Sequence, residues 1–569
     1  MTGILSTNIL SPLGLDSAQN YSAVKEGRSA LRSFRGWGGV PGQHCLGVFP
    51  EDMREALSVD GFTWFESLVI RSVKDAATSA GLDLSSERLG FILSTTKGNV
   101  ENLGMEPAQD DNYSAPGECA GKIARHLGIV TPPIVVCNAC ISGVTAQVFA
   151  ARLIRAGIYD RVVVCGADTV NAFCLAGFGS FKALSPEPCR PFDIERMGLN
   201  IGEGAATMIL SGCDADNAGG TGWSLQSYFL NNDAYHISAP SPSGEGVLRA
   251  IRGTLTEEKR QSLATVCVHG TATMFNDQME AMALGDAGLQ DVPLTALKPY
   301  YGHTMGAAGI IEPVIAMMAA AEGVVLPVPG FEECGVSRPV NVSSAARSTS
   351  GHGLLKIISG FGGCNGAAYY STRPVESAGI PAKGEFTAVR RVRISPEGVE
   401  LDGRSLPLNA KGNALLDETY RTAGISPNPR FFKMDPFSRL VYDAAALLLE
   451  DGAAGEAPES IAMILFNGSS SVVADRRHLA TFLGAEGFFP SPSVFVNTLP
   501  NVVMGELAAK YGIKGETSFI ILPRRDQQLM DTLVDASLDA SLQSAVITGW
   551  VDCDAEGSFE ADLILMKKN

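Results

Sequence analysis

Short apolar runs alternate with longer stretches of helical period through the first two thirds of the chain. The runs Ile134–Val136, Arg161–Cys165 and Pro293–Leu297 read as strands, and Ala-rich stretches from about Ser142 to Ala156 and about Ala307 to Ala321 read as helices. Because strands that alternate with helices pair side by side in one direction, this order predicts a layered α/β fold with mostly parallel strands.

The pattern changes after Tyr370. Ser371–Phe386 has two prolines and no apolar period, so we expect a linker there, followed by a hairpin around Gly398. With 569 residues, the chain is too long for one ordinary core.

The region after the linker contains a weak internal repeat. Phe437–Val441 resembles Phe65–Val69, and Glu506–Ile513 resembles Gly121–Ile129. In both places an apolar strand, a helix and a second strand follow in the same order. We therefore expect the C-terminal region to be a second copy of the N-terminal module.

Composition and charge exclude several classes of protein. The chain is 45% hydrophobic and 18% charged, which is a globular composition, and its net charge of −17 argues against binding nucleic acid or an anionic membrane. No run is long enough to span a membrane, and Met1–Leu15 lacks the basic start of a signal peptide. The twelve cysteines show no paired zinc spacing, so we expect free thiols, no metal and a cytoplasmic location.

Cys140 is the first candidate for chemistry, because it falls between a predicted strand and a predicted helix. Unpaired N–H groups at a helix N-terminus favour a thiolate, so we expect a lowered pKa. The alternative is a buried structural cysteine. His269 ends an apolar run, in the motif Val268–Thr273, and is either a site residue or a core histidine bonded to backbone.

Two further motifs follow. Lys298 and His303 frame a turn before a helix; the apolar strand ahead of Lys298 predicts its burial, and Glu280 is the expected carboxylate partner. Gly360–Gly366 is a Gly-rich turn without the residues of a phosphate or dinucleotide loop. Such a turn can bring a backbone N–H close to a reacting atom.

These four motifs, in this order, resemble the elongation-type β-ketoacyl-acyl carrier protein synthases of the thiolase superfamily, over roughly Ile4 to Tyr370. The resemblance implies a thiolase-like, five-layered αβαβα fold. Its N-terminal half would span residues 1–210 and its C-terminal half 211–374, with 385–569 as a third, truncated half-module. The implied reaction is decarboxylative Claisen condensation of a Cys-bound acyl group with malonyl-acyl carrier protein. The pathway would make fatty acids, aryl polyenes or polyketides, without metal or redox cofactor.

The resemblance also implies roles for single residues. Cys140 would carry the acyl group, His269 and His303 would stabilise the enolate, and Lys298 with Glu280 would structure the site. The backbone N–H groups of Cys140 and Phe361 would form the oxyanion hole, with Phe361 as the gating residue. The hydroxyls expected to contact the pantetheine arm belong to Thr271, Thr273 and Ser238.

In the C-terminal module, the position that matches Cys140 is Arg524 or a neighbour such as Pro523, and no cysteine lies near, so the resemblance implies that the module is catalytically silent. Relatives dimerise through the strand after the nucleophile helix, here Arg161–Cys165. We expect Ala545–Thr548 to pair with it as an imitation of a second subunit, within one chain or by exchange. The alternative is an ordinary homodimer.

Two other functions compete with a synthase. A degradative thiolase would use a second cysteine as base, and Cys364 is near the right region but follows the Gly-rich turn. A non-catalytic partner that sets chain length would need none of the catalytic residues, which an intact Cys140 with both histidines argues against.

Overall fold

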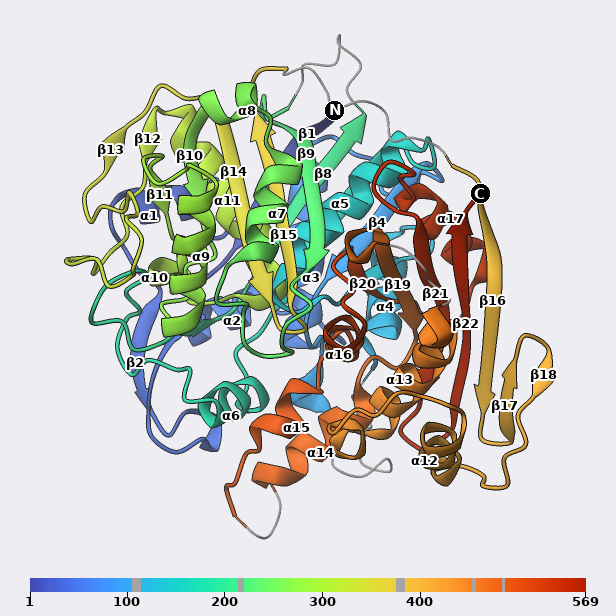
Figure 1. Ribbon diagram of the computed structural model, residues 1–569. Coiled ribbons are helices and arrows are strands. Elements are labelled where there is room, and N and C mark those ends of the chain that lie inside the picture. Colours follow the sequence, from blue (N-terminus) through green and yellow to red (C-terminus); the bar gives the residue numbers. More distant parts are fainter. Residues whose placement is uncertain (105–113, 213–219, 375–383, 453–456, 484–486) are drawn as a thin grey trace.

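Two mixed five-stranded sheets stack on opposite sides of a shared helical layer (Figure 1). The computed structural model describes residues 1–104, 114–212, 220–374, 384–452, 457–483 and 487–569. Helices α5 (Ser142–Arg155) and α11 (Ala308–Ala321) form the shared layer, α3 (Trp64–Ser79) covers the first sheet, and α7 (Glu245–Thr254) covers the second. With α9 (Met274–Asp286) packed beside α7, this is the predicted five-layered thiolase-like fold.

The two sheets have the same strand order. The first runs β5 (Ile134–Val136), β4 (Leu89–Ser94), β6 (Arg161–Asp168), β8 (Gly204–Gly212) and β1 (Thr2–Leu10). The second runs β11 (Leu294–Thr295), β10 (Leu263–Cys267), β14 (Gly353–Gly360), β15 (Cys364–Ser371) and β9 (Ser224–Asn232). In each sheet the first three strands are parallel to one another. The fourth strand pairs antiparallel with both the third and the fifth. Since helices cover both faces, the central strands are largely apolar, with Lys356 in β14 as a buried exception.

A third sheet follows in the C-terminal region. Its strands are, in order, β20 (Thr517–Ile521), β19 (Ile461–Asn467), β21 (Ala545–Cys553), β22 (Phe559–Lys568) and β16 (Phe386–Ser395). The directions repeat those of the first sheet. Its helices are α13 (Pro436–Leu449), α16 (Val502–Tyr511) and α17 (Gln527–Ser537).

The segments whose sequences matched occupy the same places in the two sheets. Helix α13 packs on its sheet as α3 does, and α16 precedes β20 as α4 (Pro116–Leu127) precedes β5. Gly128 ends α4 at φ 74°, and Gly512 ends α16 at φ 70°. This left-handed conformation closes a helix and favours glycine, which explains why both copies carry one there.

The third sheet joins the first through an antiparallel pair of edge strands. Ile520 faces Val136 and Ile521 faces Val135, so β20 and β5 make the two sheets continuous. The C-terminal region therefore docks on the first domain within one chain, as expected. The strands named for this contact were wrong.

Both strands that were expected to make this contact are interior strands of their sheets. Strand β6, which contains Arg161–Cys165, lies between β4 and β8, and β21, which contains Ala545–Thr548, lies between β19 and β22. Neither strand has an edge to offer. The strand before the nucleophile helix is the edge strand, and not the strand after it.

The remaining elements complete the fold. They are α1 (Ser17–Lys25), β2 (Leu31–Arg35), β3 (Gln43–Gly47), α2 (Glu51–Leu57), α6 (Ala172–Ser180), β7 (Ile201–Gly202), α8 (Glu257–Gln261), α10 (Lys298–Tyr301), β12 (Val324–Val325), β13 (Arg347–Ser348), β17 (Gly398–Leu401), β18 (Arg404–Ser405), α12 (Asn413–Thr422), α14 (Val472–Leu483) and α15 (Pro492–Val496). Strands β16 and β17 form the predicted hairpin. Residues 375–383 of the predicted linker lie outside the described residues. None of the described helices has the length and hydropathy to cross a membrane.

Candidate active site

Cys140 lies in a tight turn between β5 and α5. Ala139 adopts a φ of 49°, and the Ser142 hydroxyl accepts the Asn138 N–H at 2.7 Å and donates to the Ala139 carbonyl at 2.6 Å. These bonds bend the chain sharply from strand to helix. The Cys140 sulfur is thereby held half-buried at the N-terminus of α5.

Two glycines bring the helices of the central layer close together. A Cβ on Gly143 would lie 2.9 Å from the Gly309 Cα, and a Cβ on Gly309 would lie 2.6 Å from the Val144 nitrogen. Any larger residue would push α5 and α11 apart. Because His303 lies just before α11, this contact also fixes the distance between His303 and Cys140.

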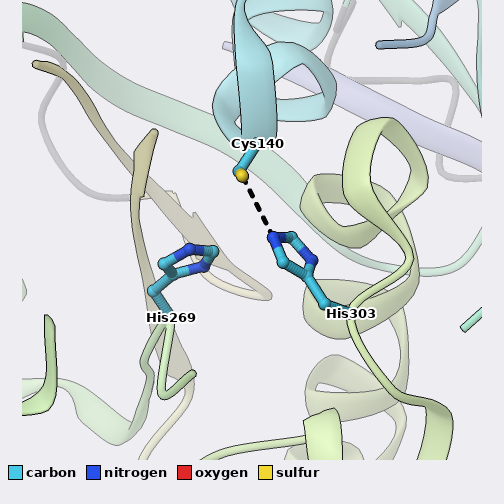
Figure 2. A group of neighbouring side chains, drawn as sticks. All are labelled: Cys140, His269 and His303. Atoms are coloured by element: carbon cyan, nitrogen blue, oxygen red, sulfur yellow. Dashed lines mark hydrogen bonds between the residues drawn. The ribbon is translucent and has the colours of Figure 1, made fainter. Parts of the chain in front are cut away.

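His303 faces the sulfur directly. Its Nε2 lies 3.0 Å from the Cys140 Sγ, while its Nδ1 accepts the Met305 N–H at 3.2 Å (Figure 2). A neutral imidazole has one donor and one acceptor nitrogen. Since Nδ1 is the acceptor, Nε2 carries the proton and points at the sulfur.

His269 completes the group from the opposite side (Figure 2). The two imidazole centroids are 5.2 Å apart and nearly perpendicular. The Lys298 ammonium donates to the His269 Nδ1 at 3.1 Å, so the Nε2 of His269 also carries its proton. The site therefore presents two N–H donors beside one thiol.

Burial keeps both rings neutral. The pKa values of His269 and His303 lie well below 6.5, first because both rings are buried and second because of the positive charge of Lys298. A neutral ring can donate a hydrogen bond to a developing anion without giving up a proton to it.

The expected lowering of the Cys140 pKa is wrong for the resting site. Burial raises the pKa of the thiol to about 12, although the charge of Lys298 and a backbone N–H act in the other direction. Removal of water from the sulfur outweighs the helix terminus. The thiol form of Cys140 is therefore favoured at neutral pH.

The expected partner of Lys298 is also wrong. The Lys298 ammonium pairs with Glu312 at 2.8 Å, and the other oxygen of Glu312 pairs with Lys356 at 2.6 Å. Sequence reasoning missed both residues. The available signal was a single acid within the apolar helix α11 and a single lysine within the apolar strand β14.

Glu280 has a different task. Its carboxylate accepts the backbone N–H groups of His269 and Gly270, both at 2.7 Å, and the Asn276 amide at 2.9 Å. Burial, followed by the nearby charge of Asp277, raises the pKa of Glu280 to about 7. Glu280 thus fixes the backbone that carries His269.

The three expected pantetheine-contacting hydroxyls lie in two loops. Thr271 and Thr273 share a hydrogen bond of 2.8 Å between their hydroxyls, directly after His269. Ser238 follows β9 and lies beside His236, whose Nδ1 accepts its backbone N–H at 3.2 Å. Thr273 and Ser238 are partly exposed, whereas Thr271 is buried.

Phe361 lies in the turn after β14, against the nucleophile. A Cβ on Gly360 would lie 3.1 Å from the Cys140 nitrogen, so the turn and the Cys140 peptide approach closely. The Phe361 ring packs with Phe178 and Phe181. Its carbonyl accepts the amide of Asn501 at 2.8 Å, so the C-terminal region contributes a contact to the site that sequence reasoning missed.

Cys364 does not fit a thiolase base. It is buried, and its thiol donates to the carbonyls of Phe361 at 3.3 Å and Asn138 at 3.6 Å. Burial, followed by the proximity of Cys140, holds its pKa well above the usual value. Such a thiol is a poor proton acceptor.

Among the described residues, Cys140, His269 and His303 also form a group whose donor atoms lie within 4.8 Å of one another, as metal ligands do. The Lys298 ammonium, 3.1 Å from His269, opposes a cation at this point. Arg524, which was expected at the position of Cys140, is exposed in the loop between β20 and α17.

Comparisons with known proteins agree with this arrangement. Residues 47–215 match the family model "Beta-ketoacyl synthase, N-terminal domain", and residues 224–332 match "Beta-ketoacyl synthase, C-terminal domain". The 3-oxoacyl-[acyl-carrier-protein] synthase 2 of Synechocystis sp. is 30% identical over 347 residues, which cover 54% of this chain and 83% of that protein. The tetracenomycin polyketide synthase ketoacyl synthase alpha subunit of Streptomyces glaucescens is 28% identical over 426 residues, 66% of this chain and 97% of that protein.

Two solved structures share the fold. The ishigamide ketosynthase/chain length factor has a TM-score of 0.59 at 24% identity and covers 66% of this chain and 99% of its own. The structure titled PfaC Keto synthase-Chain length factor has a TM-score of 0.75 at 14% identity and covers 100% of this chain and 78% of its own. The second likeness therefore includes the third sheet.

Proposed function

The chain belongs to the β-ketoacyl synthase family, and on that premise we propose that it joins a Cys140-bound acyl group to malonyl-acyl carrier protein with loss of carbon dioxide. One observation carries this proposal. Two neutral imidazoles carry their protons on Nε2, the His303 Nε2 lies 3.0 Å from the Cys140 sulfur, and the donor atoms of Cys140, His269 and His303 lie within 4.8 Å of one another, which suits an enolate formed beside a thioester.

In the first half-reaction the Cys140 sulfur attacks the carbonyl of an incoming acyl thioester. The thiol proton passes to the departing pantetheine sulfur as the old carbon–sulfur bond breaks. The oxyanion of the tetrahedral intermediate accepts hydrogen bonds from the backbone N–H groups of Cys140 and Phe361. The Nε2–H of His303 stabilises the sulfur while it is anionic.

In the second half-reaction malonyl-acyl carrier protein binds with its pantetheine arm along Thr271, Thr273 and Ser238. The bond to the carboxylate breaks, carbon dioxide leaves, and the electron pair forms an enolate whose oxygen accepts the Nε2–H groups of His269 and His303. The enolate carbon attacks the Cys140 thioester, and the sulfur leaves with a proton from solvent. The product is a β-ketoacyl thioester on the carrier protein.

We further propose that residues 385–569 are a degenerate ketosynthase half without catalytic residues, beside halves at 1–210 and 211–374. The repeated strand order and the exposed Arg524 support this. The free state of the eleven cysteines in the described residues supports a reducing compartment, and we place the protein in the cytoplasm.

Incubation with an acyl-pantetheine thioester, followed by mass spectrometry of the Cys140 peptide, tests the first step. Release of carbon dioxide from malonyl-acyl carrier protein tests the second. A synthase shows both. A non-catalytic partner that sets chain length shows neither, and a degradative thiolase cleaves a β-ketoacyl thioester with coenzyme A but releases no carbon dioxide.

A further inference from the structure

Lys356 is a charged residue in the middle of a buried apolar strand. It lies on β14 between Leu355 and Ile357, opposite Cys267 on β10 and Ala368 on β15, and its side chain is 0% exposed. Alternation along a strand turns it away from Leu355 and Ile357, into the layer that contains α11. A lysine is almost never buried this deeply unless a charged or hydrogen-bonding partner offsets the cost of removing its ammonium from water.

Its ammonium makes two contacts. It donates to Glu312 Oε2 at 2.6 Å and to the Val268 carbonyl at 3.0 Å. Glu312 Oε1 takes the Lys298 ammonium at 2.8 Å. Each oxygen of Glu312 therefore holds one lysine, and the two lysines outnumber the carboxylate by one charge.

Several other ionisable groups surround the two imidazoles. Lys298 comes from α10, Glu312 from α11, Lys356 from β14, Cys140 from the start of α5, Glu280 and Asp277 from α9, and Asp168 from the end of β6. Burial and Asp277 raise the pKa of Glu280 to about 7, so its carboxylate is only partly ionised at neutral pH. Glu280 accepts the backbone N–H of His269, whereas Glu312 accepts the ammonium of Lys298.

We propose that Lys356 is a second positioning lysine of this site. Its ammonium binds the oxygen of Glu312 that Lys298 does not contact. The two lysines and Glu312 together leave one excess positive charge near His269 and His303. The proposal rests on the proposed function for its catalytic consequence, but its electrostatic part does not depend on the reaction.

The consequence for the two rings follows from charge alone. A positive charge in a buried site opposes a second one, so the charge of Lys356 adds to burial and to the charge of Lys298 in lowering the pKa values of both imidazoles. The same charge favours the anions that the reaction forms at the thioester and the enolate. Without Lys356, the pair of Lys298 and Glu312 would carry no net charge.

Two variants separate the charge from the anchoring contact. Lys356→Met removes both, whereas Lys356→Gln keeps a hydrogen-bond donor and removes only the charge. Lys259→Met is the matched control: Lys259 is 1% exposed, and its ammonium lies 5.7 Å from the centroid of the Tyr369 ring rather than in the histidine site.

The first measurement is the ¹⁵N NMR titration of the seven histidines in selectively labelled protein, with His269→Gln and His303→Gln for assignment. In the native chain both rings should titrate well below the usual range of a histidine, because both are buried beside Lys298. Both Lys356 variants should raise the two pKa values by about one unit, and Lys259→Met should not. Unchanged values in both variants, or native values restored by Lys356→Gln, would overturn the proposal. If the Met variant fails to fold, the Gln variant decides alone.

The second measurement is carbon dioxide release from malonyl-acyl carrier protein across pH. Both variants should lower kcat about tenfold with KM within about twofold, and should move the acidic limb to higher pH, because the rings must be neutral to act. A kcat within twofold of native overturns the catalytic part. If the native chain itself releases no carbon dioxide, the proposed function fails, and the NMR titration still decides the role of Lys356.

Discussion

Arg152 on the nucleophile helix and Glu516 at the start of β20 form a two-bond ion pair across the contact between the first domain and the C-terminal region. The bonds are 2.9 and 2.6 Å long, and the side chains are 8% and 3% exposed. Helix α5 is therefore tied to the C-terminal region by charge as well as by the β5–β20 strand pair.

Removal of one partner should be much more harmful than removal of both. Arg152→Met leaves Glu516 buried and unpaired, which should lower the free energy of unfolding by about 3–5 kcal/mol. The double variant with Glu516→Gln should recover most of this loss. Melting temperatures and denaturant midpoints of the two single variants and the double variant measure the coupling, and strictly additive effects would show that the pair contributes nothing.

Cys140→Ala should abolish acyl-enzyme formation without changing the melting temperature by more than a few degrees, because the side chain is small and half-buried. Cys140→Gln should lose condensation but still release carbon dioxide from malonyl-acyl carrier protein, since its amide carbonyl can occupy the oxyanion hole. Mass spectrometry and carbon dioxide assays decide. An acylated Ala variant would remove Cys140 from its role.

His303→Ala should separate the two half-reactions. Decarboxylation should fall by at least about a hundredfold because one enolate donor is lost. Self-acylation at Cys140 should persist at a reduced rate, since the oxyanion hole is intact. Single-turnover measurements of each step compare them; an equal loss of both would mean that His303 holds up the site instead.

The raised thiol pKa predicts the pH dependence of alkylation. With a pKa of about 12, the thiolate fraction of Cys140 should rise about tenfold per pH unit from pH 7 to 9.5 without levelling off. An ordinary thiol, with a pKa of about 8.5, levels off above pH 9. Iodoacetamide labelling of the Cys140 peptide measures this, with the exposed Cys334 as internal reference. A plateau below pH 8 would mean that the resting site holds a thiolate.

A chain ended at residue 374 lacks β20 and leaves the edge of β5 unpaired. Such an edge pairs with other strands, so the shortened protein should form a new homodimer or aggregate. Size-exclusion chromatography with light scattering, compared with the full chain, measures this. A well-behaved shortened monomer would show that the edge needs no cover.

The sequence allowed the three central side chains to be predicted because each lies in a motif that resembles those of the ketosynthases. Cys140, His269 and His303 needed no knowledge of packing, and neither did the layered fold. The partner of Lys298 did need it. Glu280 and Glu312 are both acids within helices that follow a motif, and only the way α11 packs beside α10 decides between them.

The docking of the C-terminal region illustrates the same limit. The repeat predicts that both copies contain matching strands, but periodicity along a chain does not say which strand lies at the edge of a sheet. That depends on strand order, and here β5 is outermost whereas β6 is enclosed. The raised pKa of Cys140 was missed for a related reason, since the depth of burial follows from packing and not from the position of a helix start.

Strands β5 and β20 pair within one chain, so two constraints on the interface of a symmetric dimer do not apply here. A substitution in a two-fold interface appears on both sides at once, whereas here each side can change alone. The contact is also unimolecular, so dilution does not dissolve it. The contact of Asn501 with the Phe361 carbonyl can therefore change without a matching change elsewhere, and it stays in place at any concentration of the protein.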